Sequence, residues 1–104
     1  MQIQINTDHN IDGNERLAAH ITGVVEDTLS RFGDRITRVE VHLADENGGG
    51  PGVPEKRCTM EARLQHRQPT AVTKHAASLD EAIQGAAHKL KKALDSTLGR
   101  LEHG

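Results

Sequence analysis

Residues 78–104, with the sequence SLDEAIQGAAHKLKKALDSTLGRLEHG, predict one long amphipathic helix. Ser78 followed by Glu81 forms a capping box, which satisfies free backbone N–H groups at the start of a helix. Apolar residues then recur at intervals of three and four, as they do on the buried face of a helix. The members of this stripe are Leu79, Ala82, Ile83, Ala86, Leu90, Ala93, Leu94, Thr97 and Leu101.

The basic residues of the same stretch, His88, Lys89, Lys91 and Lys92, lie off the apolar stripe. The helix therefore has a side that faces the core and an outer side with positive charge. A binding protein is the first hypothesis that this arrangement suggests.

Four other segments alternate polar and apolar residues, the period of a half-buried strand. The alternation is clearest at ITRVEVHL, which places Val39, Val41 and Leu43 on one face and Arg38 and Glu40 on the other. The expected strands are residues 2–6, 36–43, 57–65 and 71–76, the last being the weakest.

A second helix is expected from about Asn14 to Phe32, with Gly33 where a helix end commonly needs a left-handed residue. It is net acidic. Residues 45–54 contain Asn-Gly-Gly-Gly-Pro-Gly, which predicts a long flexible hairpin loop. No Gly-Lys-Ser/Thr follows these glycines, so a nucleotide site is not expected there.

The predicted order of elements is β-α-β-β-β-α in a single domain, residues 1–104. Helices at both ends of a run of strands favour an α+β two-layer sandwich. We expect a four-stranded, mostly antiparallel sheet with both helices on one face and the other face open to solvent.

The open face would be polar and mixed in charge, a composition that suits structured RNA, although ordinary solvation explains the same residues almost as well. Its expected members are Gln2, Gln4, Asn6, Arg38, Glu40, His42, Arg57, Thr59, Glu61, Arg63 and Gln65. Charge also divides along the chain. Residues 1–52 hold four basic and nine acidic side chains, whereas residues 53–104 hold nine basic and six acidic ones. The basic half could face phosphates.

Composition excludes several classes of protein. Phe32 is the only aromatic residue, so binding by stacking of bases on aromatic rings is excluded. Cys58 is the only cysteine, which excludes an intramolecular disulfide and favours a reducing, cytoplasmic setting. Its position in the alternation points inward, so it is expected to be an apolar filler, not a nucleophile. Neither secretion nor membrane insertion is expected.

Seven histidines are present, but none has the H-x-x-x-H or H-x-H spacing that brings two imidazoles to one metal ion. We therefore expect surface histidines and no metal site. No enzyme activity, cofactor or small-molecule substrate is expected.

Two stretches resemble the ribosome hibernation promoting factor family, also called ribosome-associated inhibitor or sigma-54 modulation protein, in its short form. The stretch FGDRITRVEVHL, residues 32–43, is similar to the family phrase F-D-R-I-x-x-V-x-V-x-L. The stretch SLDEAI, residues 78–83, followed by Lys89, Leu90 and Leu94, is similar to D-[LM]-Y-x-A-I-D and K-L-x-x-Q-L. The resemblance spans nearly the whole chain.

This resemblance implies the same β-α-β-β-β-α fold and a translation inhibitor that binds the small subunit of 30S or 70S ribosomes. The expected contact is with 16S rRNA in the channel for mRNA and tRNA, under stress or in stationary phase. In that family the basic residues of the sheet and second helix contact rRNA. They map here onto Arg38, Arg57, Arg63, Lys74, His88, Lys89, Lys91 and Lys92.

The chain also departs from the family pattern, because it is acidic overall and has fewer lysines on its last helix. Fewer phosphate contacts mean weaker and more salt-sensitive binding. The alternative is therefore an interaction module or regulator that has kept the fold without strong rRNA binding. The sequence does not fix the oligomeric state, and a monomer is the working expectation.

Overall fold

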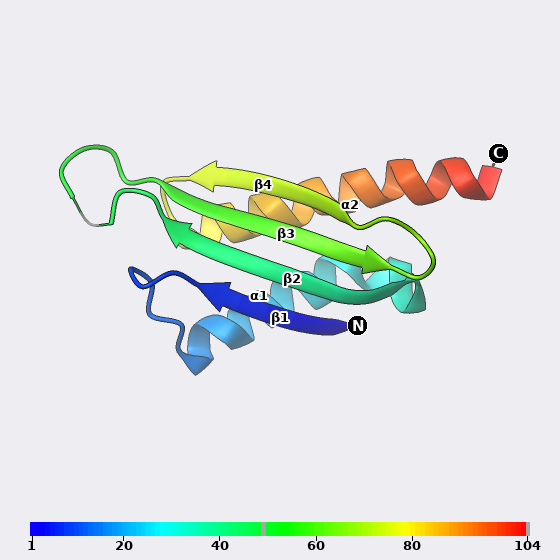
Figure 1. The fold of residues 1–104 in the computed structure, drawn as a ribbon, viewed down its shortest axis with the longest axis horizontal. Coiled ribbons are helices and arrows are strands. Elements are labelled where there is room, and N and C mark those ends of the chain that lie inside the picture. The colour runs from blue at the N-terminus through cyan, green and yellow to red at the C-terminus, as the bar shows by residue number, and fades with distance from the viewer. Residues whose placement is uncertain (49, 104) are drawn as a thin grey trace.

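The computed structural model describes residues 1–48 and 50–103, with side chains as far as residue 99, and these form a four-stranded sheet and two long helices (Figure 1). The order of elements is the expected β-α-β-β-β-α. The bounds are β1 Gln2–Thr7, α1 Glu15–Leu29, the 3-10 segment η1 Ser30–Arg35, β2 Ile36–Asp45, β3 Lys56–Leu64, β4 Thr70–Ala76 and α2 Leu79–His103.

The strands lie side by side in the order β1-β2-β3-β4. β1 runs parallel to β2, and a parallel neighbour requires a crossover, which α1 provides. β2, β3 and β4 form antiparallel hairpins. Both helices cover the same face of the sheet, as Figure 1 shows, and the opposite face is open. The expected mostly antiparallel α+β sandwich is confirmed.

Side chains near the helix starts cap both helices. Asn14 Oδ1 accepts a hydrogen bond from the backbone N–H of Leu17 at 2.9 Å, before α1. Ser78 Oγ accepts from the backbone N–H of Glu81 at 3.2 Å and donates to Glu81 Oε1 at 3.1 Å, before α2. Both predicted helix starts are confirmed, since such caps satisfy N–H groups that have no partner within the helix.

The end of the first helix differs from the prediction. α1 stops at Leu29, and Phe32 lies in η1, where it is buried. Gly33 has φ +51° and ψ −128°, a conformation that residues with a Cβ rarely adopt, and it turns the chain toward β2. The helix therefore ends earlier because the chain needs this tight turn.

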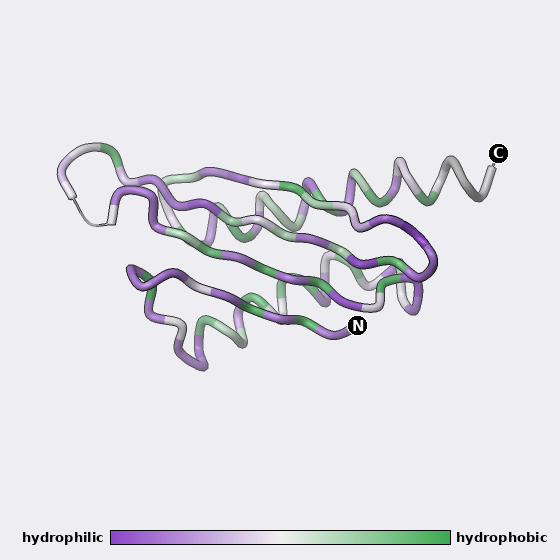
Figure 2. Tube along the Cα trace, viewed as in Figure 1, coloured by the Kyte–Doolittle hydropathy of each residue, from purple (hydrophilic) through white to green (hydrophobic). Residues whose placement is uncertain are grey.

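The core lies between the sheet and the helices, and hydropathy alternates along the strands in Figure 2. Val39, Val41 and Leu43 of β2 are buried, as the alternation predicted. The inward residues of β3 are Cys58, Met60, Ala62 and Leu64. The stripe of α2 is buried at Ala82, Ile83, Ala86, Leu90 and Leu94, and half-buried at Leu79, Ala93 and Thr97; Leu101 lies outside the described side chains.

A β-bulge at the start of β2 breaks the predicted alternation. Ile36 pairs with Leu64 and Arg38 pairs with Arg63, so Thr37 has no register partner. An extra residue reverses the phase of the pleat. Ile36 therefore points into the core, with 1% of its surface exposed, although Arg38 two positions later points out.

The loop between β2 and β3 is residues 46–55, one position later than the predicted 45–54. Asp45 belongs to β2, where its Oδ2 lies 2.8 Å from Lys56 Nζ and its register partner is Lys56. The backbone N–H of Glu46 donates to the carbonyl of Glu55 at 2.9 Å. This ion pair and hydrogen bond extend the hairpin beyond the hydrophobic part of the strands.

Candidate nucleic-acid interface

The open face consists of cross-strand rows that the register sets. Gln4 lies opposite Glu40, and Glu40 lies opposite Glu61. Asn6 lies opposite His42, and His42 lies opposite Thr59. Thr59 Oγ1 and Thr73 Oγ1 are hydrogen-bonded at 3.0 Å. The face is polar on β1, β2 and β3, as predicted, and Thr73 extends it onto β4.

The three arginines predicted as rRNA contacts on this face are each paired with a carboxylate. Arg38 Nη2 lies 3.1 Å from Glu40 Oε2, and Arg63 Nε lies 3.0 Å from the same oxygen. Arg57 Nη1 lies 2.9 Å from Glu46 Oε1. Each guanidinium group keeps further N–H donors, but a neighbouring carboxylate offsets its positive charge and weakens its attraction for a phosphate.

The sequence contains a signal for this pairing that the prediction did not use. Arg38 and Glu40 are two positions apart on one strand, and so are Glu61 and Arg63 on the next. Residues at i and i+2 of a strand lie on the same face. Opposite charges at this spacing neutralise one another locally, whichever strand lies alongside.

Lys74, also predicted as a contact, lies on the other side of the sheet. Its register partner is the buried Cys58, so it points toward the helices. β4 is an edge strand, and the stem of Lys74 extends over α2 at Gly85, where a Cβ on residue 85 would lie 2.7 Å from Lys74 Cγ. Gly85 thus leaves room for this lysine beside the helix.

Lys89 and Lys92 lie on the flank of α2 that faces this edge strand. Lys89 Nζ donates a hydrogen bond to the carbonyl oxygen of Thr73 in β4 at 2.7 Å. Lys89 follows Gly85 by four positions and Lys92 follows Lys89 by three, so all three share one helix flank. His88 is exposed, but it follows Gln84, which faces α1, by four positions and therefore lies off this flank. We call Lys74, Lys89 and Lys92 the β4–α2 edge.

In the part of the chain that the structure describes, no carboxylate forms an ion pair with a member of the β4–α2 edge. All three side chains are exposed. Exposed ammonium groups without a carboxylate partner can exchange their counterions for phosphates. This edge is therefore the region of the described surface best suited to bind a polyanion.

Lys91 does not belong to this edge. Asp95 follows Lys91 by four positions, and its Oδ1 lies 2.6 Å from Nη2 of Arg31 in η1. Gln84 precedes Lys91 by seven positions and faces α1. Residues spaced by four and seven share a helix face. Lys91 therefore lies on the side of α2 that faces α1, and the expected single basic flank divides into two.

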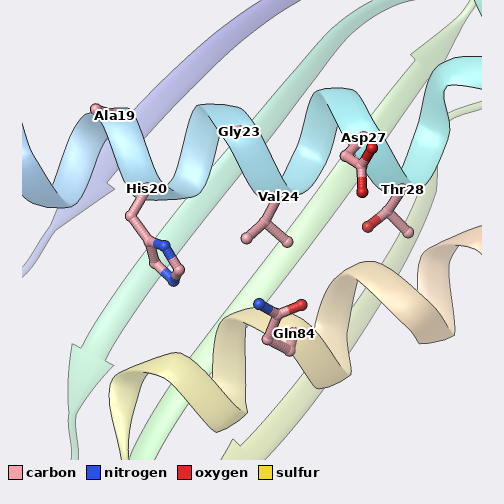
Figure 3. Close-up of a pocket in the computed structure, with 7 residues that line it drawn as sticks. All are labelled: Ala19, His20, Gly23, Val24, Asp27, Thr28 and Gln84. Carbon is pink, nitrogen blue, oxygen red and sulfur yellow. The ribbon is translucent and has the colours of Figure 1, made fainter.

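The helix layer has a solvent-open groove of about 420 Å³ between α1 and α2. Figure 3 shows Val24 of α1 and Gln84 of α2 pointing toward one another across it. Near one end, His20 Nε2 lies 2.7 Å from Asp80 Oδ1, joining the two helices. The remaining lining residues are Ala19, Gly23, Asp27 and Thr28.

Cys58 lies inside the core, as the alternation predicted, with 0% of its surface exposed. Desolvation by burial raises the pKa of its thiol to about 12. A nucleophilic cysteine needs a lowered pKa and access to substrate, and Cys58 has neither. Within residues 1–48 and 50–103, no group of three or more His, Cys, Asp or Glu side chains could hold a metal ion. Neither described helix is long and apolar enough to cross a membrane.

Comparison with solved structures identifies the same fold in two proteins. The first is the N-terminal domain of Protein Y from Thermus thermophilus, with a TM-score of 0.76, 16% identity, and coverage of 93% of this chain and 99% of that one. The second is a ribosomal subunit interface protein from Coxiella burnetii, with a TM-score of 0.72, 16% identity, and coverage of 95% and 99%. No curated protein sequence matches the chain.

The sequence itself matches a family model over residues 3–102, which include all of the strands except Gln2 and nearly all of α2. A match of this extent covers both the open face and the β4–α2 edge. The chain therefore belongs to the family described as Sigma 54 modulation protein / S30EA ribosomal protein.

Proposed function

We propose that the chain binds the small ribosomal subunit and keeps ribosomes inactive under stress or in stationary phase. The contact would be with 16S rRNA in the channel for mRNA and tRNA, so that occupancy alone blocks translation. The family description, which names a ribosomal protein and not an enzyme, supports ribosome association. The printed name of the Coxiella burnetii neighbour, a ribosomal subunit interface protein, points in the same direction. Ribosome binding implies a cytoplasmic location.

The observation that supports rRNA contact most strongly is the β4–α2 edge. Lys74, Lys89 and Lys92 extend from two different elements toward one exposed border of the sheet. Phosphate contacts supply most of the affinity of proteins for nucleic acids, and lysine is a common donor. We propose that this edge binds the phosphates, with Lys91 making at most a separate contact on the other flank of α2.

The polar sheet face supports a secondary role. Its Gln, Asn and Thr side chains can hydrogen-bond sugar hydroxyls, phosphates or base edges, which is how shape-specific RNA contacts are made. Arg38, Arg57 and Arg63 would add little affinity while neighbouring carboxylates offset their charge. The chain is proposed to act as a monomer, without cofactor or small-molecule substrate.

A protein-interaction module is the second candidate, and one observation favours it. The arginines of the open face are paired with carboxylates, so the face offers hydrogen bonds without strong net charge, as many protein interfaces do. Binding of the purified protein to ribosomes at low and moderate salt separates the two functions. Saturable binding that weakens with salt supports rRNA contact, whereas absence of binding at low salt transfers the function to a protein partner.

A further inference from the structure

A cluster of two arginines and two glutamates occupies the open face where β2 and β3 pair. Arg38 lies opposite Arg63, and Glu40 lies opposite Glu61. Like charges directly opposite on neighbouring strands repel, so neither pair is favourable by itself. The favourable contacts run along and between the strands instead: Glu40 Oε2 lies 3.1 Å from Arg38 Nη2 and 3.0 Å from Arg63 Nε, and Glu61 Oε1 lies 3.2 Å from Arg63 Nε.

Glu40 is the centre of this cluster and its least exposed member. Its side chain is 15% exposed, compared with 31% for Glu61, 35% for Arg38 and 48% for Arg63. A partly buried ion pair is screened by salt less than an exposed one. Salt should therefore weaken the bonds to Glu40 less than it weakens a fully exposed ion pair.

The same pattern extends to the border of the face. Arg57 is paired with Glu46 at 2.9 Å. The β4–α2 edge has no such carboxylates among the described residues. Within one small domain, cations that could bind phosphate are neutralised on the sheet and left available along the edge.

We propose that Glu40 and Glu61 are specificity-determining residues that keep Arg38 and Arg63 from binding RNA phosphates. The glutamates engage one nitrogen of each guanidinium group and offset its charge, so a phosphate that approaches the arginines also meets a neighbouring negative charge. The two glutamates thereby confine strong phosphate binding to the β4–α2 edge and set how the protein is oriented on RNA. This inference rests on the proposed function.

The test is the double variant Glu40→Gln/Glu61→Gln. Glutamine keeps the size and one carbonyl acceptor of each side chain but removes the charge. Affinity for purified 30S subunits is measured over a range of salt concentrations. Release of two phosphate-binding arginines should tighten binding at low salt and steepen the plot of log K against log salt by about 1.4 to 1.8, since each phosphate contact adds about 0.7 to 0.9.

A charge-matched control separates this effect from the change in net charge. Glu26→Gln/Asp34→Asn also removes two negative charges, from exposed positions on α1 and η1 that form no ion pair with another described residue. This control should leave the salt slope unchanged. Adding Arg38→Gln/Arg63→Gln to the glutamate variant should return the slope to the wild-type value. Thermal unfolding checks the fold. If the glutamate variant is destabilised, Arg38→Gln/Arg63→Gln alone is tested instead, and it should leave the wild-type salt slope unchanged because these arginines do not contact phosphate.

The outcomes distinguish this inference from the proposed function. If wild-type protein binds in a salt-sensitive way but the glutamate variant matches the control, the inference is wrong and the ribosome contact stands. If only the glutamate variant binds, the two residues do block phosphate contacts and the native protein has another partner. If neither protein binds at low salt, both the inference and the proposed rRNA contact are wrong.

Discussion

Gly85→Ala tests whether Lys74 lies against α2, the contact that brings the lysine into the β4–α2 edge. A glycine in the interior of a helix costs about 1 kcal/mol relative to alanine, so the substitution would ordinarily stabilise the protein by that amount. Here the new Cβ would lie 2.7 Å from Cγ and 2.9 Å from Cε of Lys74. Both distances are shorter than carbon atoms tolerate, so the stem must move away from the helix.

The size of the effect follows from the two opposing terms. Burying one methylene fully contributes about 0.8 kcal/mol, and the stem of Lys74 is only partly covered. Alanine in place of glycine would by itself stabilise the helix by about 1 kcal/mol. Moving the stem of Lys74 off the helix should offset much of this, so that the net stabilisation is below about 0.5 kcal/mol. In a Lys74→Ala background the stem is absent, and Gly85→Ala should give the full gain.

Urea unfolding of the four proteins in this double-mutant cycle gives the interaction free energy, expected at about 0.5 to 1 kcal/mol. Equal stabilisation in both backgrounds, within about 0.3 kcal/mol, would mean that Lys74 does not pack on Gly85. Gly85→Ala also moves the Lys74 ammonium without changing net charge. Ribosome affinity should therefore fall modestly in this variant although the protein is no less stable.

Three further predictions concern the fold. Gly33→Ala should lower the free energy of unfolding by about 1 to 3 kcal/mol, because residue 33 has a positive φ. Gly23→Ala should raise the free energy of unfolding by up to about 1 kcal/mol, because Gly23 lies in a helix with open space around it. Urea unfolding measures both values. Cys58, with its pKa of about 12, should react with a thiol reagent at pH 8 only after denaturation, and rapid labelling of the native protein would contradict its burial. The hydrogen bond from Lys56 lowers the pKa of Asp45 below 3.8. The stabilisation by this ion pair is therefore complete above pH 3.8 and is lost as pH falls through the lowered pKa. In Asp45→Asn the free energy of unfolding should depend less on pH in this range. An unchanged pH profile would contradict the ion pair.

The order of elements was predictable because each element repeats one simple period over enough residues. The alternation around Val39 and the stripe around Leu90 identify a strand and a helix without knowledge of their partners. The alternation of polar and apolar residues in β3 also correctly predicted that Cys58 lies inside the core. Burial patterns of this kind depend only on residues that are close together in the sequence.

The details that sequence missed depend on contacts between distant residues or on backbone geometry. The bulge at Thr37 arises from the register of β2 against β3, and the early end of α1 arises from the turn at Gly33. Each residue advances about 100° around an α-helix, which places Lys91 on a different side of α2 from Lys89 and Lys92. The sequence could therefore have predicted part of the division of the basic residues. Which flank faces β4 became clear only from the hydrogen bond between Lys89 and Thr73.

The central claim is that phosphates bind at the β4–α2 edge, and ribosome co-sedimentation tests it most directly. Wild-type protein is compared with Lys89→Gln/Lys92→Gln at low and moderate salt, using both 30S subunits and 70S ribosomes. The control, Arg16→Gln/Ala19→Glu, produces the same net charge at exposed positions on α1. Glutamine and lysine have similar helix propensity, so the course of α2 should not change. Thermal unfolding checks the effect of losing the hydrogen bond from Lys89 to Thr73.

If the edge binds phosphates, wild-type protein binds saturably, the salt slope of the lysine variant is smaller by about 1.4 to 1.8, and the α1 control binds almost as tightly as wild type. Equal loss of binding in the two variants would show that only net charge matters and would contradict the assignment of the edge. Undiminished binding by the lysine variant would contradict it as well.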